Sequence, residues 1–330
     1  MQHKTTTIPQ VCNTVLSELV EAGITNEQIK AFEKSVSEAG SLLDKLNLDN
    51  LSIKHPITKA RPETLTVEYL RALWEEVVGR VIIARLSADR TLRDLLLGFI
   101  DAISTRNTLL GALAARAALE GAASYDGISR KIMGKKELIE AELLPFLRRN
   151  SHPTKSLYVP SLIDDLIRFQ HGTRFWSTGD CPMTVEECHA WLKNSIYESK
   201  DDEKEQSIAG QLLDALRLNQ TNVLTNLKNI AGRTLNMYTL GIYHMLSEFC
   251  HPNADNRNLG VHTSTSKDVH FVEFTRKWPT KRETKGIMLG MWGVIKAIDV
   301  HIQADNAIQE SMQDLYNEID LGKLMSSEKE

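Results

Sequence analysis

The chain has 330 residues, of which 42% are hydrophobic, so it can bury one large core or two ordinary ones. Its formal net charge of −4 argues against a surface that attracts nucleic-acid or anionic-lipid phosphates over its whole area. The four cysteines lack the spacing of a disulfide framework, which favours a reducing compartment. The sequence opens with no apolar run of signal-peptide length, and no segment is expected to span a bilayer. We therefore expect a cytoplasmic protein that binds no membrane.

Apolar residues recur with the period of a helix along most of the chain, which predicts an all-α fold built as a multi-helix bundle. An N-terminal helix and a linker arm are expected over 1–64, because the stretch near 48–64 has two prolines and no period. The bundle itself is expected over 65–318, with an insertion at about 150–204. A frayed tail is predicted over 319–330.

Three interruptions are predicted within the first half of the bundle, at polar or glycine-containing stretches near 87–89, 104–107 and 126–127. The only convincing strand signal is the β-rich run DVHFVEFTRKW, in which Val269, Phe271 and Glu273 alternate with His270, Val272 and Phe274. This run predicts one small β-hairpin near 268–278.

One unusually apolar helix is predicted over 107–125, where alanine, glycine and leucine occupy nearly every face. Only Arg116 and Glu120 carry charge within it, and their spacing of four residues places them on one face, where they can pair. Two interpretations remain open. The two residues form an ordinary ion pair at the rim of the core, or they mark a functional site, since a charged pair inside such a helix is costly.

A second apolar helix is predicted to end at His251, because Pro252 disfavours the helical conformation of the residue before it. Tyr243, Ser247 and His251 follow one another at intervals of four, so they lie within about 80° of one another around the helix. That face offers a phenol, a hydroxyl and an imidazole. His251 is either a C-terminal cap that interacts with unpaired carbonyls or a catalytic group.

The two apolar helices are expected to pack against each other. Both are too apolar to leave a charged side chain without a partner. We therefore predict that Arg116 or Glu120 lies within hydrogen-bonding reach of Tyr243, Ser247 or His251.

An R-x-x-x-E helix followed by a Y-x-x-L-S-x-x-x-H-P segment resembles a pattern of poorly characterised, all-helical prokaryotic proteins of the HEPN-like superfamily. The matching residues are Arg116, Glu120, Tyr243, Leu246, Ser247, His251 and Pro252. HEPN ribonucleases belong to toxin–antitoxin and phage-defence systems and carry an R-x(4–6)-H motif, usually in a dimer. In that family the arginine and the histidine act on RNA without a metal, and the 2′-hydroxyl attacks the adjacent phosphate.

The segment RNLGVH, from Arg257 to His262, fits the family's motif literally. Gly260 and the preceding turn, however, predict a loop here, whereas the family places its motif on a helix. Since preorganisation favours a group whose position is restrained, we expect His251 rather than His262 to be the catalytic histidine. The candidate catalytic residues are His251, Arg116, Glu120, Tyr243, Ser247, Arg257 and His262.

The sequence thus predicts a HEPN-like protein of a defence or toxin system that acts as a metal-independent endoribonuclease. The alternative is a non-catalytic helical module for protein interaction. Cys181, Cys188 and His189 lack the paired spacing of a zinc site, and no nucleotide-binding glycine motif occurs, so neither a metal nor a cofactor is expected. The expected partners are RNA, a partner protein or antitoxin, and a second copy of the chain.

Overall fold

The structure is a computed structural model that describes residues 13–43, 51–58, 65–171, 226, 238–250, 259, 261–266, 269–274 and 278–327. This part of the chain is mostly helical, as predicted.

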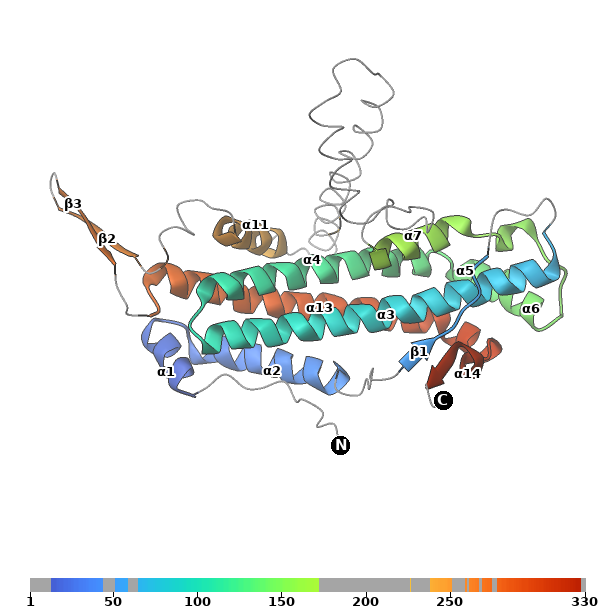
Figure 1. Ribbon diagram of the computed structural model, residues 1–330, viewed down its shortest axis with the longest axis horizontal. Helices are drawn as coiled ribbons and strands as arrows, with labels where there is room; N and C mark the ends of the chain where they lie inside the picture. Colours follow the sequence, from blue (N-terminus) through green and yellow to red (C-terminus); the bar gives the residue numbers. More distant parts are fainter. Residues whose placement is uncertain are drawn as a thin grey trace, which may run out of the picture.

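Three long helices lie side by side and form the body of the molecule (Figure 1). They are α3 (Val67–Ser104), α4 (Thr108–Met133) and α13 (Lys281–Glu318). Each begins at a side-chain cap, as helix starts require for their unpaired N–H groups. Thr66 and Asn107 accept hydrogen bonds from the first turns of α3 and α4, and Thr280 forms a reciprocal capping box with Glu283 on α13.

The predicted interruption at 104–107 is confirmed, because α3 ends at Ser104 and Asn107 caps α4. The interruptions predicted near 87–89 and 126–127 are wrong, since α3 and α4 run through both. Hydrogen bonds satisfy the polar side chains that suggested them. Ser87 donates to the carbonyl of Ala84, and Asp126 accepts a hydrogen bond from Arg130 one turn later.

Shorter helices cover the three long ones. They are α1 (Asn13–Glu21), α2 (Asn26–Leu43), α5 (Lys136–Leu138), α6 (Leu144–Leu147), α7 (Pro160–His171), α11 (Tyr238–Cys250) and α14 (Leu321–Leu324), with a π-helical turn at Ile139–Leu143 and a 3-10 turn at Lys155–Leu157. Part of the expected insertion belongs to the core, because Leu157 and Leu166 are fully buried beside α3.

Two antiparallel strand pairs accompany the helices. Strand β2 (Val261–Ser266) pairs with β3 (Val269–Phe274), and this hairpin projects from one end of the bundle (Figure 1). Strand β1 (Leu51–Ile53) pairs with β4 (Met325–Ser327) at the other end.

A frayed tail was predicted over 319–330, but the structure is regular over 321–327. There the chain forms α14 and β4, and Leu324 is buried. The pairing with β1 orders this segment, and the carbonyl of Leu324 also accepts a hydrogen bond from the backbone of Lys54. The sequence shows no such partner because it lies more than 250 residues away.

The apolar interior of the described chain falls into two clusters, one after the other along the bundle. The first cluster takes residues 92–103 of α3, 112–123 of α4 and 287–300 of α13, together with α1, α2 and α11. The second takes residues 70–84, 125–132 and 304–315 of the same long helices, together with α6 and α7. A polar interval separates the two clusters, at 85–91 of α3 and around His301 of α13.

By length and composition alone, α13 is long and apolar enough to cross a membrane. This differs from the sequence-based expectation that no segment can do so. The most apolar stretch of 18 residues in α13 has a mean hydropathy of 1.2, and 67% of that stretch is buried against the rest of the bundle. A core helix of a soluble protein has the same properties, so this feature is weak evidence in either direction.

Candidate functional site

The candidate site lies where α11 packs across α4, and glycines of α13 set how closely α11 approaches. A Cβ at Gly286 would lie 3.0 Å from the ring of Phe249. A Cβ at Gly293 would lie 3.0 Å from Leu246. Both distances are shorter than an ordinary van der Waals contact, so the glycines let α11 approach α13 closely with its Tyr243 face towards α4.

Arg116, Glu120 and Tyr243 meet at this contact. Arg116 Nε donates to Glu120 Oε1 at 3.0 Å, and the Tyr243 hydroxyl donates to the same oxygen at 2.9 Å. The guanidinium lies over the Tyr243 ring at 5.4 Å from its centroid, and its Nη2 is 3.5 Å from the hydroxyl. The geometric prediction is therefore confirmed for these three residues. We call them, together with the adjacent Cys250, the α4–α11 corner.

The corner lies at the edge of the core. The side chain of Arg116 is 25% exposed and that of Glu120 is 34% exposed. The ion pair therefore lies at the rim of the core. Rim placement is compatible with a site, because a ligand can reach a guanidinium that is fixed but not covered.

The ionisation of the corner follows from its partial burial. Burial raises the pKa of Tyr243, and the hydrogen bond and charge of Glu120 raise it further. Burial also raises the pKa of the Cys250 thiol, although the nearby Arg116 opposes this shift. Burial lowers the pKa of Arg116, but the charge of Glu120 and the contact with Tyr243 outweigh this effect and raise it. At neutral pH the corner therefore holds a fixed arginine cation beside a protonated phenol and a protonated thiol.

The remaining candidate residues are not part of this cluster. The hydroxyl of Ser247 donates to the backbone carbonyl of Tyr243 at 2.8 Å, so it bonds to its own helix. His251 and Arg257 lie outside the described residues, as do the cysteines and the histidine considered for zinc. His262 was predicted to lie in a loop, but it belongs to β2 and stands opposite Glu273 of β3. Pairing with β3 gives this segment a regular conformation that its glycine and turn residues do not indicate.

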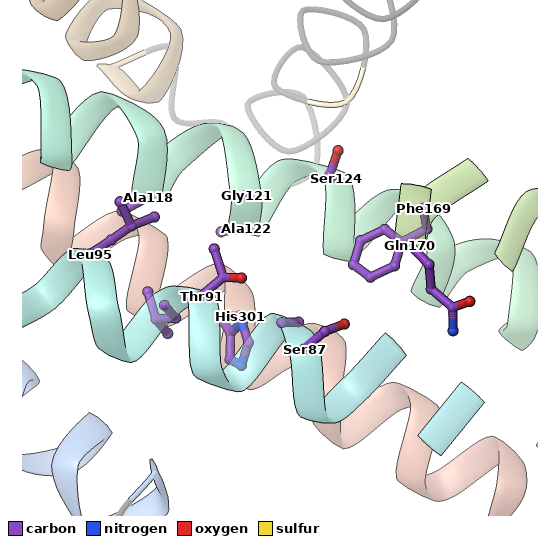
Figure 2. Close-up of a pocket in the computed structure, with 12 residues that line it drawn as sticks. Ser87, Thr91, Leu95, Ala118, Gly121, Ala122, Ser124, Phe169, Gln170 and His301 are labelled. Carbon is purple, nitrogen blue, oxygen red and sulfur yellow. The ribbon is translucent and has the colours of Figure 1, made fainter. Parts of the chain in front are cut away.

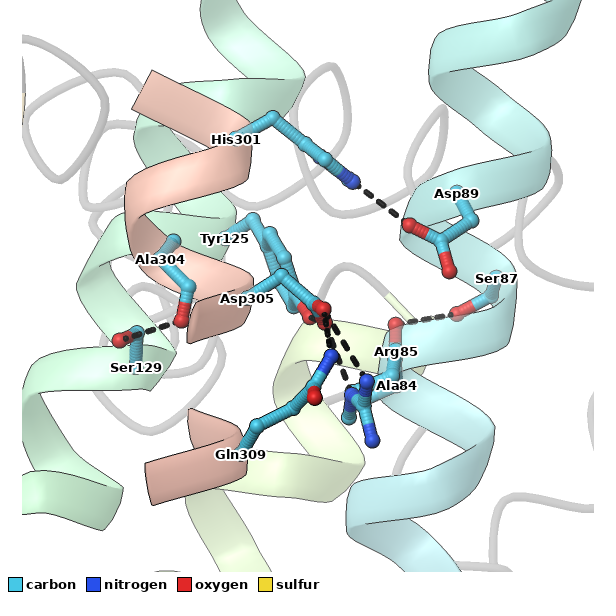
Figure 3. Close-up of polar contacts among 10 residues, drawn as sticks. All are labelled: Ala84, Arg85, Ser87, Asp89, Tyr125, Ser129, His301, Ala304, Asp305 and Gln309. Carbon is cyan, nitrogen blue, oxygen red and sulfur yellow. Dashed lines mark hydrogen bonds and ion pairs between the residues drawn. The ribbon is translucent and has the colours of Figure 1, made fainter. Parts of the chain in front are cut away.

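A second polar cluster, which the sequence patterns did not predict, occupies the interval between the two apolar clusters (Figure 3). Its centre is Asp305 of α13. Arg85 donates to both carboxylate oxygens at 2.8 and 3.0 Å, the Tyr125 hydroxyl donates to Oδ1 at 2.7 Å, and Gln309 donates to Oδ2 at 2.6 Å. Burial raises the pKa of Asp305, but the bonds and charge of Arg85 outweigh burial and hold that pKa below its ordinary value.

His301 lies one turn before Asp305 on α13. Its Nε2 is 2.6 Å from Oδ1 of Asp89, and its ring stacks on Tyr125 with centroids 4.8 Å apart. We call the set of Arg85, Asp89, Tyr125, His301, Asp305 and Gln309 the polar belt. One pattern in the sequence could have indicated the polar belt. His301, Asp305 and Gln309 are spaced four residues apart, which places three polar side chains on one face of the helix.

Within the described part of the chain, no group of three or more His, Cys, Asp or Glu side chains is arranged to hold a metal ion. The fold and the corner define a mostly helical bundle with an ion-paired contact at the rim of its core. Searches of protein families, curated proteins and solved structures found no match to this chain.

Proposed function

We propose that the chain is a HEPN-like protein of a prokaryotic defence or toxin system and that it cleaves RNA without a metal ion. The observation that carries this proposal is the three-way contact of Arg116, Glu120 and Tyr243. It fixes a partly exposed cation beside the end of α11, and the chain continues from Cys250 directly into His251. Arg116 also interacts with the thiol of Cys250, the residue that precedes His251 in the sequence, which supports the combination of a cation and an imidazole that the resemblance implies.

Arg116 suits the role of a phosphate-binding group. A guanidinium has five N–H donors, and Glu120 and Tyr243 occupy only part of them. Its position is fixed by a carboxylate on one side and a ring face on the other, so little reorganisation is needed when a phosphate arrives. In this role it stabilises the charge that develops on the phosphorane oxygens.

The proton transfers are assigned to His251. The 2′-oxygen attacks phosphorus and loses its proton to a base, the 5′-oxygen leaves and takes up a proton, and the product is a cyclic phosphate. Tyr243 and Cys250 stay protonated at neutral pH because both pKa values are raised, so neither is available to accept the proton. Glu120 and Tyr243 act as positioning residues that hold Arg116, and Ser247 supports the helix rather than the reaction.

The rival is a non-catalytic interaction module that binds a partner protein, an antitoxin or a second copy of the chain. One observation favours it: Glu120 already neutralises Arg116, so the corner is complete without a ligand. In this alternative the contact only ties α4 to α11, and the polar residues after α11 only cap the helix.

Purified protein incubated with total RNA in the presence of EDTA separates the two. The ribonuclease proposal expects fragments that end in 2′,3′-cyclic phosphate. Intact RNA in the presence of folded protein supports the interaction module instead. The first outcome would support RNA as the partner, and cytoplasmic placement stays a separate prediction.

Variants then assign the roles. His251→Ala should abolish cleavage, and Arg116→Lys should lower it at least about tenfold, because an ammonium cannot reproduce the forked geometry of a guanidinium. Arg90→Lys is the matched control, since Arg90 forms an exposed pair of the same spacing with Asp94 on α3. Full activity in His251→Ala, with none in His262→Ala or Arg257→Ala, would mean that RNLGVH is the active centre.

A further inference from the structure

A pocket of about 230 Å³ opens between α3, α4, α7 and α13, beside the polar belt (Figure 2). Its mouth is formed by the exposed residues Ser87 and Thr91 of α3. Ala118 and Ala122 of α4 form buried parts of its wall, and Phe169 of α7 lines one end. The pocket exists because the residues that face each other here are small, so α3 and α4 do not fill the space between them.

His301 is the buried polar group of this pocket. Its side chain is only 6% exposed, yet it lines the pocket. Its Nε2 lies 2.6 Å from Oδ1 of Asp89, and in the tautomer in which Nε2 donates to this carboxylate, Nδ1 is an acceptor. No other described residue forms a hydrogen bond with Nδ1. Nδ1 of this largely buried side chain thus has no hydrogen-bond partner among the described residues, and a ligand in the pocket can supply the donor.

The lining also limits the charge of a ligand. None of the twelve residues around the pocket is Asp, Glu, Lys or Arg, and His301 is the only titratable one. An ion would lose its hydration here without gaining a counter-charge, so an uncharged ligand is favoured. The hydroxyls at the mouth can still bond to a polar edge of the ligand.

Size and shape restrict the ligand further. At about 30 Å³ for each water molecule, the pocket holds on the order of seven waters. Since covalently bonded atoms lie closer together than waters do, a fused two-ring molecule of about nine or ten non-hydrogen atoms fits. Alanine walls and the Phe169 ring favour a flat, apolar body.

From this geometry we infer a binding site for a small, uncharged aromatic heterocycle that donates an N–H hydrogen bond to Nδ1 of His301. The site does not depend on the ribonuclease proposal. It shares no lining residue with the α4–α11 corner.

Indole and benzofuran form a matched pair of probes, because the two molecules have nearly the same shape and differ in that only indole has a donor. Isothermal titration calorimetry of the full chain should show indole binding about tenfold more tightly than benzofuran, the loss expected when one buried acceptor is left unpaired. No binding of indole up to millimolar concentration would overturn the site. Equal binding of the two probes would overturn the role assigned to His301.

Gly121 provides a variant that blocks the pocket without disturbing the fold. It lines the pocket, and a Cβ at this position meets no atom within 4 Å. Gly121→Leu should therefore fill the space and lower indole affinity at least about tenfold, while the stability stays unchanged or rises, since leucine favours helix more than glycine does. Gly98→Leu is the control, because Gly98 of α3 also has open space, is exposed and lies outside the pocket. Unchanged indole binding in Gly121→Leu, or an equal loss in both variants, would refute the site.

Discussion

Asp305 is the residue whose replacement should destabilise the polar belt most. Its carboxylate accepts four hydrogen bonds, two from Arg85, one from Tyr125 and one from Gln309. Asp305→Ala removes all four at once. It leaves a guanidinium whose side chain is only 22% exposed and a Tyr125 side chain that is completely buried.

The expected loss in the free energy of unfolding follows from the two groups that lose their partner, the Arg85 guanidinium and the Tyr125 hydroxyl. Breaking a buried ion pair by removing one partner costs about 3–5 kcal/mol, because the remaining charge stays desolvated. An unsatisfied buried hydroxyl costs about 1–3 kcal/mol. The two costs do not simply add, since water can enter the space left by the carboxylate, so we expect a loss of about 4 kcal/mol in the free energy of unfolding.

Glu120→Ala is the natural comparison, since Glu120 also pairs with an arginine and accepts from a tyrosine. Its side chain is 34% exposed and that of Arg116 is 25% exposed, so water can replace much of what is lost. We expect a cost of about 1 kcal/mol there. The contrast between the two variants tests burial itself rather than the number of bonds.

Urea unfolding at pH 7, followed by circular dichroism, measures both variants against the unchanged chain. The midpoint should fall much further for Asp305→Ala than for Glu120→Ala, and the slope with denaturant should stay the same if unfolding remains two-state. A loss below about 1 kcal/mol for Asp305→Ala would refute the reasoning, because it would mean that Arg85 is solvated without its partner.

Three further predictions concern single contacts. The pKa of Asp305 is lowered, because Arg85 outweighs the raising effect of burial, so its stabilisation is present above about pH 4 and is lost as the pH falls through the lowered pKa. Asp305→Asn should therefore flatten the decline in unfolding free energy between about pH 5 and 2 in acid titrations. Gly290→Ala should cost about 1–3 kcal/mol in urea unfolding, because its Cβ would lie 2.6 Å from the Phe99 ring; a neutral result would show that the ring can move. Tyr243→Phe should cost about 1 kcal/mol by the same assay, because it removes the hydrogen bond to Glu120 and the long one from Arg116, and a much larger loss would indicate a wider role for the hydroxyl.

The contact between α4 and α11 was predictable from the sequence because it follows from helical period and burial. A spacing of four residues places Arg116 with Glu120 on one face, and the apolar character of both helices requires that their polar side chains find partners. The depth of the contact was not predictable. Whether a charged pair on an alanine-rich helix lies inside the core or at its rim depends on which neighbours cover it.

The polar belt shows where sequence patterns stop being informative. Asp305 meets Arg85 from 220 residues away and Tyr125 from 180 residues away, and no local rule selects these partners. Polar residues near 87–89 and 126–127 resemble helix breaks when they are considered singly. In the fold they are satisfied by side-chain bonds, so the helices continue through them.

The corner and the pocket use different residues of α4, which makes their functions separable. At 100° per residue, Ala118 lies about 160° from Arg116 and Ala122 lies about 160° from Glu120, whereas Ser124, which also lines the pocket, lies about 40° from Glu120 and one turn further along α4. A substitution at Arg116 should therefore affect RNA cleavage without changing indole binding, and Gly121→Leu should do the reverse. Because one rigid helix carries both sites, a variant that impaired both activities while the chain stayed folded would mean that they are coupled through α4.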